Sequence, residues 1–115
     1  LNYYKRIIFK FIIFTIIMYN HNMLPLIEMY TSKNCFFCSS AKQLLDKKKL
    51  QFSEIDITTN NDEKNTMIKR SRGMHTVPQI FINNIHIGGC EHLYALEELG
   101  RLDKIILGIF DHAKK

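Results

Sequence analysis

The chain has 115 residues, of which 46% are hydrophobic, and it carries a formal net charge of +5. This length predicts one domain, and the hydrophobic content suffices for a core without disulfide cross-links. Residues 23–115 hold 13 basic and 11 acidic side chains. The excess of basic over acidic side chains is small, and no stripe of Lys and Arg is interleaved with aromatic residues. The sequence therefore does not indicate a nucleic-acid-binding protein.

An apolar run occupies residues 7–19, directly after two basic residues. The run is shorter than the roughly 20 residues that a membrane-spanning helix needs, and Lys10 lies within it. It resembles the apolar part of a signal peptide, but no small residues follow that would form a cleavage site. We therefore expect residues 1–22 to be a hydrophobic extension, either a non-native start ahead of Met23 or a weak anchor, and residues 23–115 to form one domain.

The first half of this domain alternates between strand and helix patterns. Residues 26–30 predict a first strand, and apolar positions then recur at helical spacing over about residues 35–50. Residues 51–57 predict a second strand, and Thr59 and Asp62 predict a capping box at the start of a polar helix that ends at the next glycine. This order predicts two parallel strands joined by a right-handed crossover.

The second half predicts a hairpin and two helices. Gln79–Ile82 and Ile85–Gly88 are short apolar runs, and the Asn83-Asn84 pair between them suits a two-residue turn because Asn tolerates positive φ. A helix follows and closes at Gly100. The residues expected to form the buried stripes of the two helices are Leu93, Leu96 and Leu99, then Leu102, Ile105, Ile106, Ile109 and Phe110. We therefore predict an α/β protein of thioredoxin-like fold, with a four-stranded mixed sheet between two helical layers.

Cys35 and Cys38 are spaced Cys-x-x-Cys directly after the first predicted strand, with Cys35 at the start of a helix. This spacing after a strand is typical of redox chemistry in a reducing compartment. The unpaired N–H groups and the dipole at a helix start favour a thiolate, which is the form that attacks disulfides. Cys38 lies one turn later and could attack a mixed disulfide formed on Cys35. We assign Cys35 as the nucleophile and Cys38 as the resolving thiol, the two forming a redox-active disulfide.

Zinc is the main alternative for a Cys-x-x-Cys pair. Cys90 and His92 would complete a tetrahedral set of ligands with Cys35 and Cys38. Redox chemistry is favoured over a zinc-binding module because Cys38 continues into a helix, whereas a zinc knuckle usually lies in a tight turn.

Four segments make the sequence resemble the glutaredoxins, specifically the small bacterial dithiol type. They are Cys-Phe-Phe-Cys at residues 35–38, Thr-Val-Pro-Gln-Ile-Phe-Ile at 76–82, Ile-Gly-Gly-Cys-Glu at 87–91 and Leu-Tyr-Ala-Leu at 93–96. The resemblance covers about residues 26–107. It implies an enzyme, a glutathione-dependent thiol–disulfide oxidoreductase that reduces protein disulfides and glutathione mixed disulfides.

The resemblance also implies a glutathione-binding site. Pro78 should follow a cis peptide bond and bring the backbone of Val77 beside Cys35, where peptide-like glutathione could pair with it as an added strand. The helix start near Gly89 would offer N–H groups to the γ-glutamyl carboxylate, and Glu91 would accept from the glutathione amino group. The residues expected to bind glutathione are Lys33, Phe37, Thr76, Val77, Pro78, Gly89, Cys90 and Glu91.

Three positions depart from the family pattern. Phe36 stands where Pro usually follows the first cysteine, and Glu91 replaces the usual Asp. Ser32 stands where Lys is common, so we transfer the binding of the glycine carboxylate of glutathione to Lys33. In the family, loss of the Pro is compatible with an iron–sulfur carrier in which Cys35 and two glutathiones bridge a 2Fe-2S cluster between two subunits. The retained second cysteine favours dithiol chemistry over this alternative.

These inferences give a set of expected partners. Glutathione serves as the reducing co-substrate, and oxidised or glutathionylated proteins are the substrates. We expect a monomer in the cytoplasm that holds no metal, with anchoring to a membrane or export only if residues 1–22 are native.

Overall fold

The computed structural model describes residue 12 and residues 24–108. Apart from Ile12, the extension expected over residues 1–22 lies outside this part of the chain, as do Ile109 and Phe110 of the last predicted helix. The elements of residues 24–108 are β1 (Ile27–Thr31), α2 (Phe36–Lys47), β2 (Ser53–Asp56), α3 (Asn61–Arg70), β3 (Gln79–Ile82), β4 (Ile85–Gly88), α4 (Cys90–Glu98) and α5 (Leu102–Ile106). None of the helices in the described residues has the length and apolar character that crossing a membrane requires.

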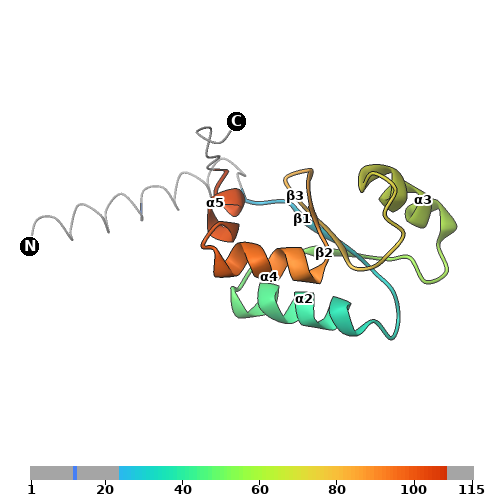
Figure 1. The fold of residues 1–115 in the computed structure, drawn as a ribbon, viewed down its shortest axis with the longest axis horizontal. Coiled ribbons are helices and arrows are strands. Elements are labelled where there is room, and N and C mark those ends of the chain that lie inside the picture. The colour runs from blue at the N-terminus through green and yellow to red at the C-terminus, as the bar shows by residue number, and fades with distance from the viewer. Residues whose placement is uncertain (1–11, 13–23, 109–115) are drawn as a thin grey trace, which may run out of the picture.

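The four strands form one mixed sheet in the order β2-β1-β3-β4. Strands β1 and β2 are parallel, whereas β1 pairs with β3 and β3 with β4 in antiparallel register. Helices α2, α4 and α5 lie on one side of the sheet and α3 lies on the other (Figure 1). The predicted thioredoxin-like fold, a four-stranded mixed sheet between two helical layers, is confirmed.

Alternation along the central strands produces a core on each face of the sheet, because neighbouring side chains point to opposite faces. Ile27 and Met29 of β1 pack with Leu45 of α2 and Leu93 of α4 in the larger core. Tyr30, Phe81 and Met67 form the smaller core under α3. The larger core holds α2 against the sheet through Ala41, Leu44 and Leu45.

The hairpin agrees with its prediction in both bounds and turn chemistry. Asn83 and Asn84 have φ values of 51° and 66°, the left-handed region that Asn tolerates best among residues with a side chain. Gly100, with a φ of 68°, follows the end of α4 as expected. The turn and the helix end could be predicted from the sequence because one or two residues determine the backbone conformation at each of them.

Two details of the helices differ from the prediction. The amide oxygen of Asn60 accepts from the backbone N–H of Glu63 at 3.1 Å and caps α3, so the predicted capping box of Thr59 and Asp62 was placed one residue too early. Leu99 is 67% exposed, not part of a buried stripe, because α4 ends at Glu98 and the chain turns away from the core.

Candidate active site

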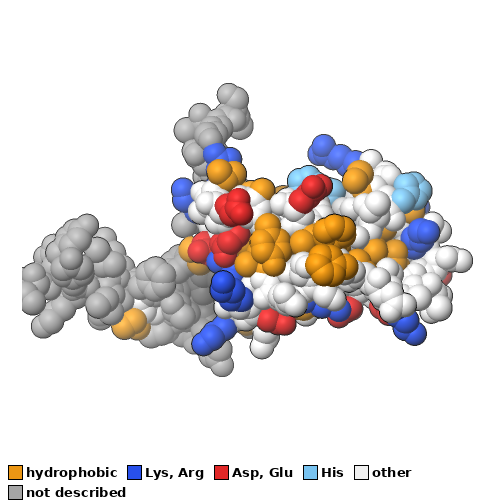
Figure 2. Space-filling view, turned by 60° about the horizontal axis from the view of Figure 1, so that its bottom comes forward, with side chains coloured by type: hydrophobic (Ala, Val, Ile, Leu, Met, Phe, Trp, Pro, Cys, Tyr) orange, Lys and Arg blue, Asp and Glu red, His pale blue; other side chains and the backbone are white. Residues whose placement is uncertain are grey.

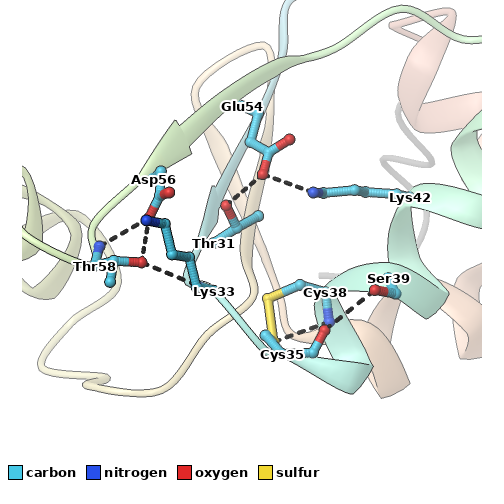
Figure 3. A network of polar contacts seen from close by, with 9 residues as sticks. All are labelled: Thr31, Lys33, Cys35, Cys38, Ser39, Lys42, Glu54, Asp56 and Thr58. Carbon is cyan, nitrogen blue, oxygen red and sulfur yellow. Dashed lines mark hydrogen bonds and ion pairs between the residues drawn. A yellow bond between two sulfur atoms is a disulfide. The ribbon is translucent and has the colours of Figure 1, made fainter.

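Cys35 and Cys38 form a disulfide at the start of α2 (Figure 3). Cys35 is the N-cap residue of this helix, and its sulfur accepts from the backbone N–H of Cys38 at 3.0 Å. Cys38 is buried beneath the helix, whereas Cys35 is partly exposed. Only the Cys35 sulfur is therefore placed for contact with a molecule arriving from solvent.

The segment before β3 lies against this disulfide. The peptide bond between Val77 and Pro78 is cis, as the resemblance implied. The carbonyl oxygen of Val77 lies 3.8 Å from the Cys35 sulfur, so the expected approach of the Val77 backbone to Cys35 is confirmed. A backbone segment thus runs directly beside the accessible sulfur.

A groove of about 270 Å³ continues from this segment toward the start of α4. Its lining brings together seven of the eight residues predicted to bind glutathione: Phe37, Thr76, Val77, Pro78, Gly89, Cys90 and Glu91. They come from α2, from the segment before β3 and from the first turn of α4, three places far apart in the sequence. This set of residues is the candidate ligand groove.

Apolar side chains border the disulfide and the groove on the outside of the molecule. Phe36 and Phe37 are 75% and 62% exposed and pack edge to face. Figure 2 shows hydrophobic side chains gathered over the face that presents α2 and α4. Tyr94 of α4 is also exposed on its ring, and its hydroxyl donates to the carbonyl oxygen of Ser40, which ties the two helices together.

The far end of the groove is the N-terminus of α4. Gly89 is the N-cap residue, and its N–H donates to Nδ1 of His92 at 3.1 Å. The N–H groups of Cys90 and Glu91 stand in the first turn, where a helix leaves its donors unpaired. Gly88 permits this arrangement, because it has a φ of 115° and a Cβ there would lie 2.6 Å from Nδ1 of His92.

Gln79 is a site-supporting residue that the sequence analysis did not identify. Its side chain is buried, and its amide nitrogen donates to the carbonyl and hydroxyl oxygens of Thr76 at 3.0 and 3.3 Å. Its amide oxygen lies 2.7 Å from Nε2 of His86, whose pKa is lowered chiefly by burial. A glutamine beside the proline in an otherwise apolar strand was the available signal. The contacts anchor the groove wall to the β3–β4 hairpin.

Lys33 does not line the groove with the other seven predicted residues. It lines a second hollow of about 570 Å³, which also includes Cys35, Cys38, Lys42, Glu54 and Asp56. The backbone N–H of Lys33 donates to the hydroxyl of Thr58, which holds the loop before α2 close to the end of β2 (Figure 3). The two cysteines therefore stand between a groove and a charged hollow.

Charged groups in this hollow form a network that the sequence analysis also missed. Lys42 donates to a carboxylate oxygen of Glu54 at 2.6 Å, and the buried hydroxyl of Thr31 donates to the same oxygen at 2.7 Å. These hydrogen bonds, that of Lys42 first, lower the pKa of Glu54. The side chain of Thr58 likewise lowers the pKa of Asp56. Both carboxylates are thus charged at neutral pH.

The set of zinc ligands considered from the sequence does not come together. Among the residues that the structure describes, no three His, Cys, Asp or Glu side chains are grouped so that they could hold a metal ion. Cys90 is a free, buried cysteine whose pKa is raised by burial, and His92 is engaged with Gly89. The zinc-module alternative therefore lacks a ligand cluster.

Comparison with known proteins gives consistent matches. The glutaredoxin family model matches residues 27–87. Glutaredoxin 1 of Rickettsia typhi is 48% identical over 88 residues, which cover 76% of this chain and 85% of that protein. Glutaredoxin 3 of Escherichia coli is 49% identical over 80 residues, 70% of this chain and 95% of that protein. The solution structure of a Brucella melitensis glutaredoxin matches with a TM-score of 0.65 at 40% identity, over 75% of this chain and 94% of that one.

Proposed function

Because this chain belongs to the glutaredoxin family, we propose that it is a thiol–disulfide oxidoreductase that takes its electrons from glutathione. Its substrates are protein disulfides and mixed disulfides between proteins and glutathione. We propose that it is localised in the cytoplasm, where thiols are kept reduced. We propose that the protein acts as a monomer.

One observation carries this proposal. The groove lined by the seven predicted residues adjoins the accessible sulfur of the disulfide through Val77, whose carbonyl oxygen lies 3.8 Å from that sulfur. A tripeptide that lies along Val77 would pair with its backbone as an added strand and bring its own sulfur to Cys35. This juxtaposition of peptide-binding wall and redox sulfur is what a glutathione-using enzyme needs.

The roles of the two cysteines follow from their different exposure. The Cys35 thiolate attacks a substrate disulfide, bonds to one sulfur and releases the other as a thiolate. From a glutathione mixed disulfide, Cys35 takes the glutathione moiety, and a second glutathione thiolate then attacks it to release glutathione disulfide. From a protein disulfide, buried Cys38 attacks the mixed disulfide on Cys35 and releases the reduced protein. Two glutathione molecules then reduce the Cys35–Cys38 disulfide and leave as glutathione disulfide.

The end of the groove supplies recognition of the γ-glutamyl group. The first-turn N–H groups of Cys90 and Glu91 attract its carboxylate, and the dipole of α4 adds to that attraction. The Glu91 carboxylate accepts from its ammonium group. Thr76 and Pro78 form the wall beside Val77, and Phe37 covers the ligand from the side of α2. Lys33, in the hollow on the other side of Cys35, is proposed to attract the glycine carboxylate.

A coupled assay tests the proposal. Glutathione reductase and NADPH regenerate glutathione while the protein reduces a small mixed disulfide, and NADPH consumption reports turnover. We expect turnover that depends on both the protein and glutathione. Reduction driven equally well by thioredoxin reductase in the absence of glutathione would contradict the proposal.

The same preparation tests the cluster-carrier alternative. An absorbance spectrum of anaerobically purified protein would reveal a 2Fe-2S chromophore if Cys35 and glutathione held a cluster. We expect no visible absorption and full activity without reconstitution. A bridging cluster would instead occupy Cys35 and suppress turnover until it was removed.

A further inference from the structure

The hollow on the other side of the disulfide from the ligand groove contains an ion pair whose carboxylate is also hydrogen-bonded to the central strand of the sheet. Glu54 of β2 accepts from Lys42 of α2 and, through the same oxygen, from the buried hydroxyl of Thr31 at the end of β1. The side chains of Lys42 and Glu54 are 32% and 41% exposed. Thr31 thus anchors Glu54 to the sheet, and Glu54 in turn fixes where the Lys42 ammonium lies.

Lys42 belongs to the face of α2 that carries the redox pair. It lies one helical turn after Cys38 and two turns after Cys35, and residues four apart on a helix are neighbours. All three line the same hollow (Figure 3). The Lys42 side chain reaches across this hollow to β2, where Glu54 holds it 2.6 Å from its carboxylate oxygen.

Charge next to the two sulfurs has a defined effect on redox equilibrium. The disulfide is neutral, whereas the reduced pair carries a negative charge when one cysteine is a thiolate. A free cation in the hollow therefore stabilises the reduced form, and an unpaired carboxylate destabilises it. An ion pair has little effect on the stability of the reduced form, because its two charges offset each other.

We propose that Glu54 is a positioning residue that restrains the Lys42 ammonium and offsets its charge, so that the reduction potential of the Cys35–Cys38 pair lies between the values that a free Lys42 and an unpaired Glu54 would give it. This inference rests on the proposed function only in treating these cysteines as the working redox pair. Reduction adds two electrons to the disulfide and breaks its S–S bond. It yields one thiol, which takes up a proton, and one thiolate, whose charge responds to the pair.

Other charged groups lie on the elements around the two cysteines. Lys33 lies in the loop before α2, and Asp56 of β2 accepts from the backbone and hydroxyl of Thr58. Glu91 lies on the groove side, at the start of α4. The Lys42 charge also lowers the pKa of Asp56, but no hydrogen bond joins these groups to Lys42. Exchanging Glu54 or Lys42 therefore breaks one ion pair and leaves the other charged side chains in place.

The test is the equilibrium of the protein with dithiothreitol in Glu54→Gln, Lys42→Gln and the double variant. Glu54→Gln should favour the reduced form by about three- to fivefold, as expected for charges on partly exposed side chains. This corresponds to a potential raised by about 15–20 mV. Lys42→Gln should shift the equilibrium by a similar factor in the opposite direction. The double variant should return close to the wild-type value.

Two further variants separate charge from structure. Lys42→Arg keeps the charge and should keep the potential. Lys48→Gln breaks an ion pair with Glu97 at the other end of α2 and should leave the potential unchanged. The alkylation midpoint of Cys35 should move down in Glu54→Gln and up in Lys42→Gln, and these shifts should shrink at about 1 M salt.

Opposite signs in the two single variants support the proposal. Shifts of the same sign, or no shift in either variant, would overturn it. Because the measurement uses dithiothreitol, it does not depend on glutathione. An inactive protein in the glutathione assay with opposite shifts here would refute the proposed function and leave this inference standing.

Discussion

The sulfur of Cys35 lies 3.8 Å from the carbonyl oxygen of Val77, although the two residues are 42 positions apart in the sequence. This contact joins the start of α2 to the segment that precedes β3. The disulfide and the ligand groove therefore share one border. Substitutions in the groove should alter the use of glutathione, whereas substitutions of Cys35 or Cys38 should alter the thiol–disulfide chemistry itself.

Replacing each cysteine by serine should separate two reactions. Cys35→Ser should abolish all activity, because it removes the thiolate that attacks the substrate. Cys38→Ser should keep the reduction of glutathione mixed disulfides, which needs only one thiol, and lose direct reduction of protein disulfides. Both variants are assayed on both substrates. Equal losses in the two variants on both substrates would refute this division of roles.

The thiolate of reduced Cys35 should be well populated at neutral pH. Its sulfur accepts from the N–H of Cys38 at the start of α2, where partial positive charge lies. We expect the midpoint of its alkylation rate against pH to fall below the value of roughly 8.5 for a free cysteine. Mass spectrometry assigns the modified residue. Buried Cys90 provides an internal control and should react slowly. A Cys35 midpoint near that of free cysteine would contradict the prediction.

Gln79→Leu should weaken glutathione binding more than it slows the chemical step. The substitution removes both hydrogen bonds to Thr76, at a cost of about 0.5–1.5 kcal/mol in stability for each. Loosening of the groove wall should raise the KM for glutathione several-fold, with little change in the alkylation midpoint of Cys35. Gln51→Leu, the same change at an exposed position, is the control. An unchanged KM would show that Gln79 does not position the wall.

Gly88→Ala should destabilise the fold more than Gly100→Ala. Both glycines have positive φ, so each alanine is strained, by about 1 kcal/mol at Gly100, where the side chain meets open space. At Gly88 the new Cβ also collides with the His92 ring, and we expect about 2–4 kcal/mol in total. Urea denaturation measures both free energies of unfolding. Equal losses would mean that the ring moves aside at no cost.

The sequence allowed a correct prediction wherever a few neighbouring residues determine the local structure. The Asn83-Asn84 turn and the two strands beside it follow from local backbone preference, and the Cys-x-x-Cys spacing located the disulfide. Seven groove residues were assembled from family motifs, not from spacing, because no local rule brings Val77 next to Cys35.

The contacts that could not be predicted from the sequence depend on the register in which the strands pair. Glu54 reaches Lys42 and Thr31 only because β2 pairs in parallel with β1, with Met29 opposite Glu54 and Thr31 opposite Asp56. A one-residue shift would turn Glu54 to the other face of the sheet. The role of Lys33 was transferred from a motif position that Ser32 occupies in this chain, and both residues line the second hollow, away from the groove.

The Glu91 side chain offers the sharpest test of ligand recognition, because it lies at the groove end and away from the sulfurs. It lines the groove in the first turn of α4, next to unpaired backbone donors. A ligand with both a carboxylate and an ammonium group, such as the γ-glutamyl end of glutathione, fits this combination. A carboxylate at this position attracts the ammonium group, whereas a lysine repels it.

Glu91→Lys should therefore weaken the use of glutathione by about tenfold or less, since a charge contact on an exposed side chain is partly screened. The reaction of reduced Cys35 with a small neutral disulfide should stay nearly unchanged, because the thiol itself is untouched. Glu98→Lys makes the same charge change at the opposite end of α4 and is the matched control. Kinetics with both substrates on all three proteins decide the matter. If the glutathione dependence of Glu91→Lys equals that of Glu98→Lys, Glu91 does not contact the ligand.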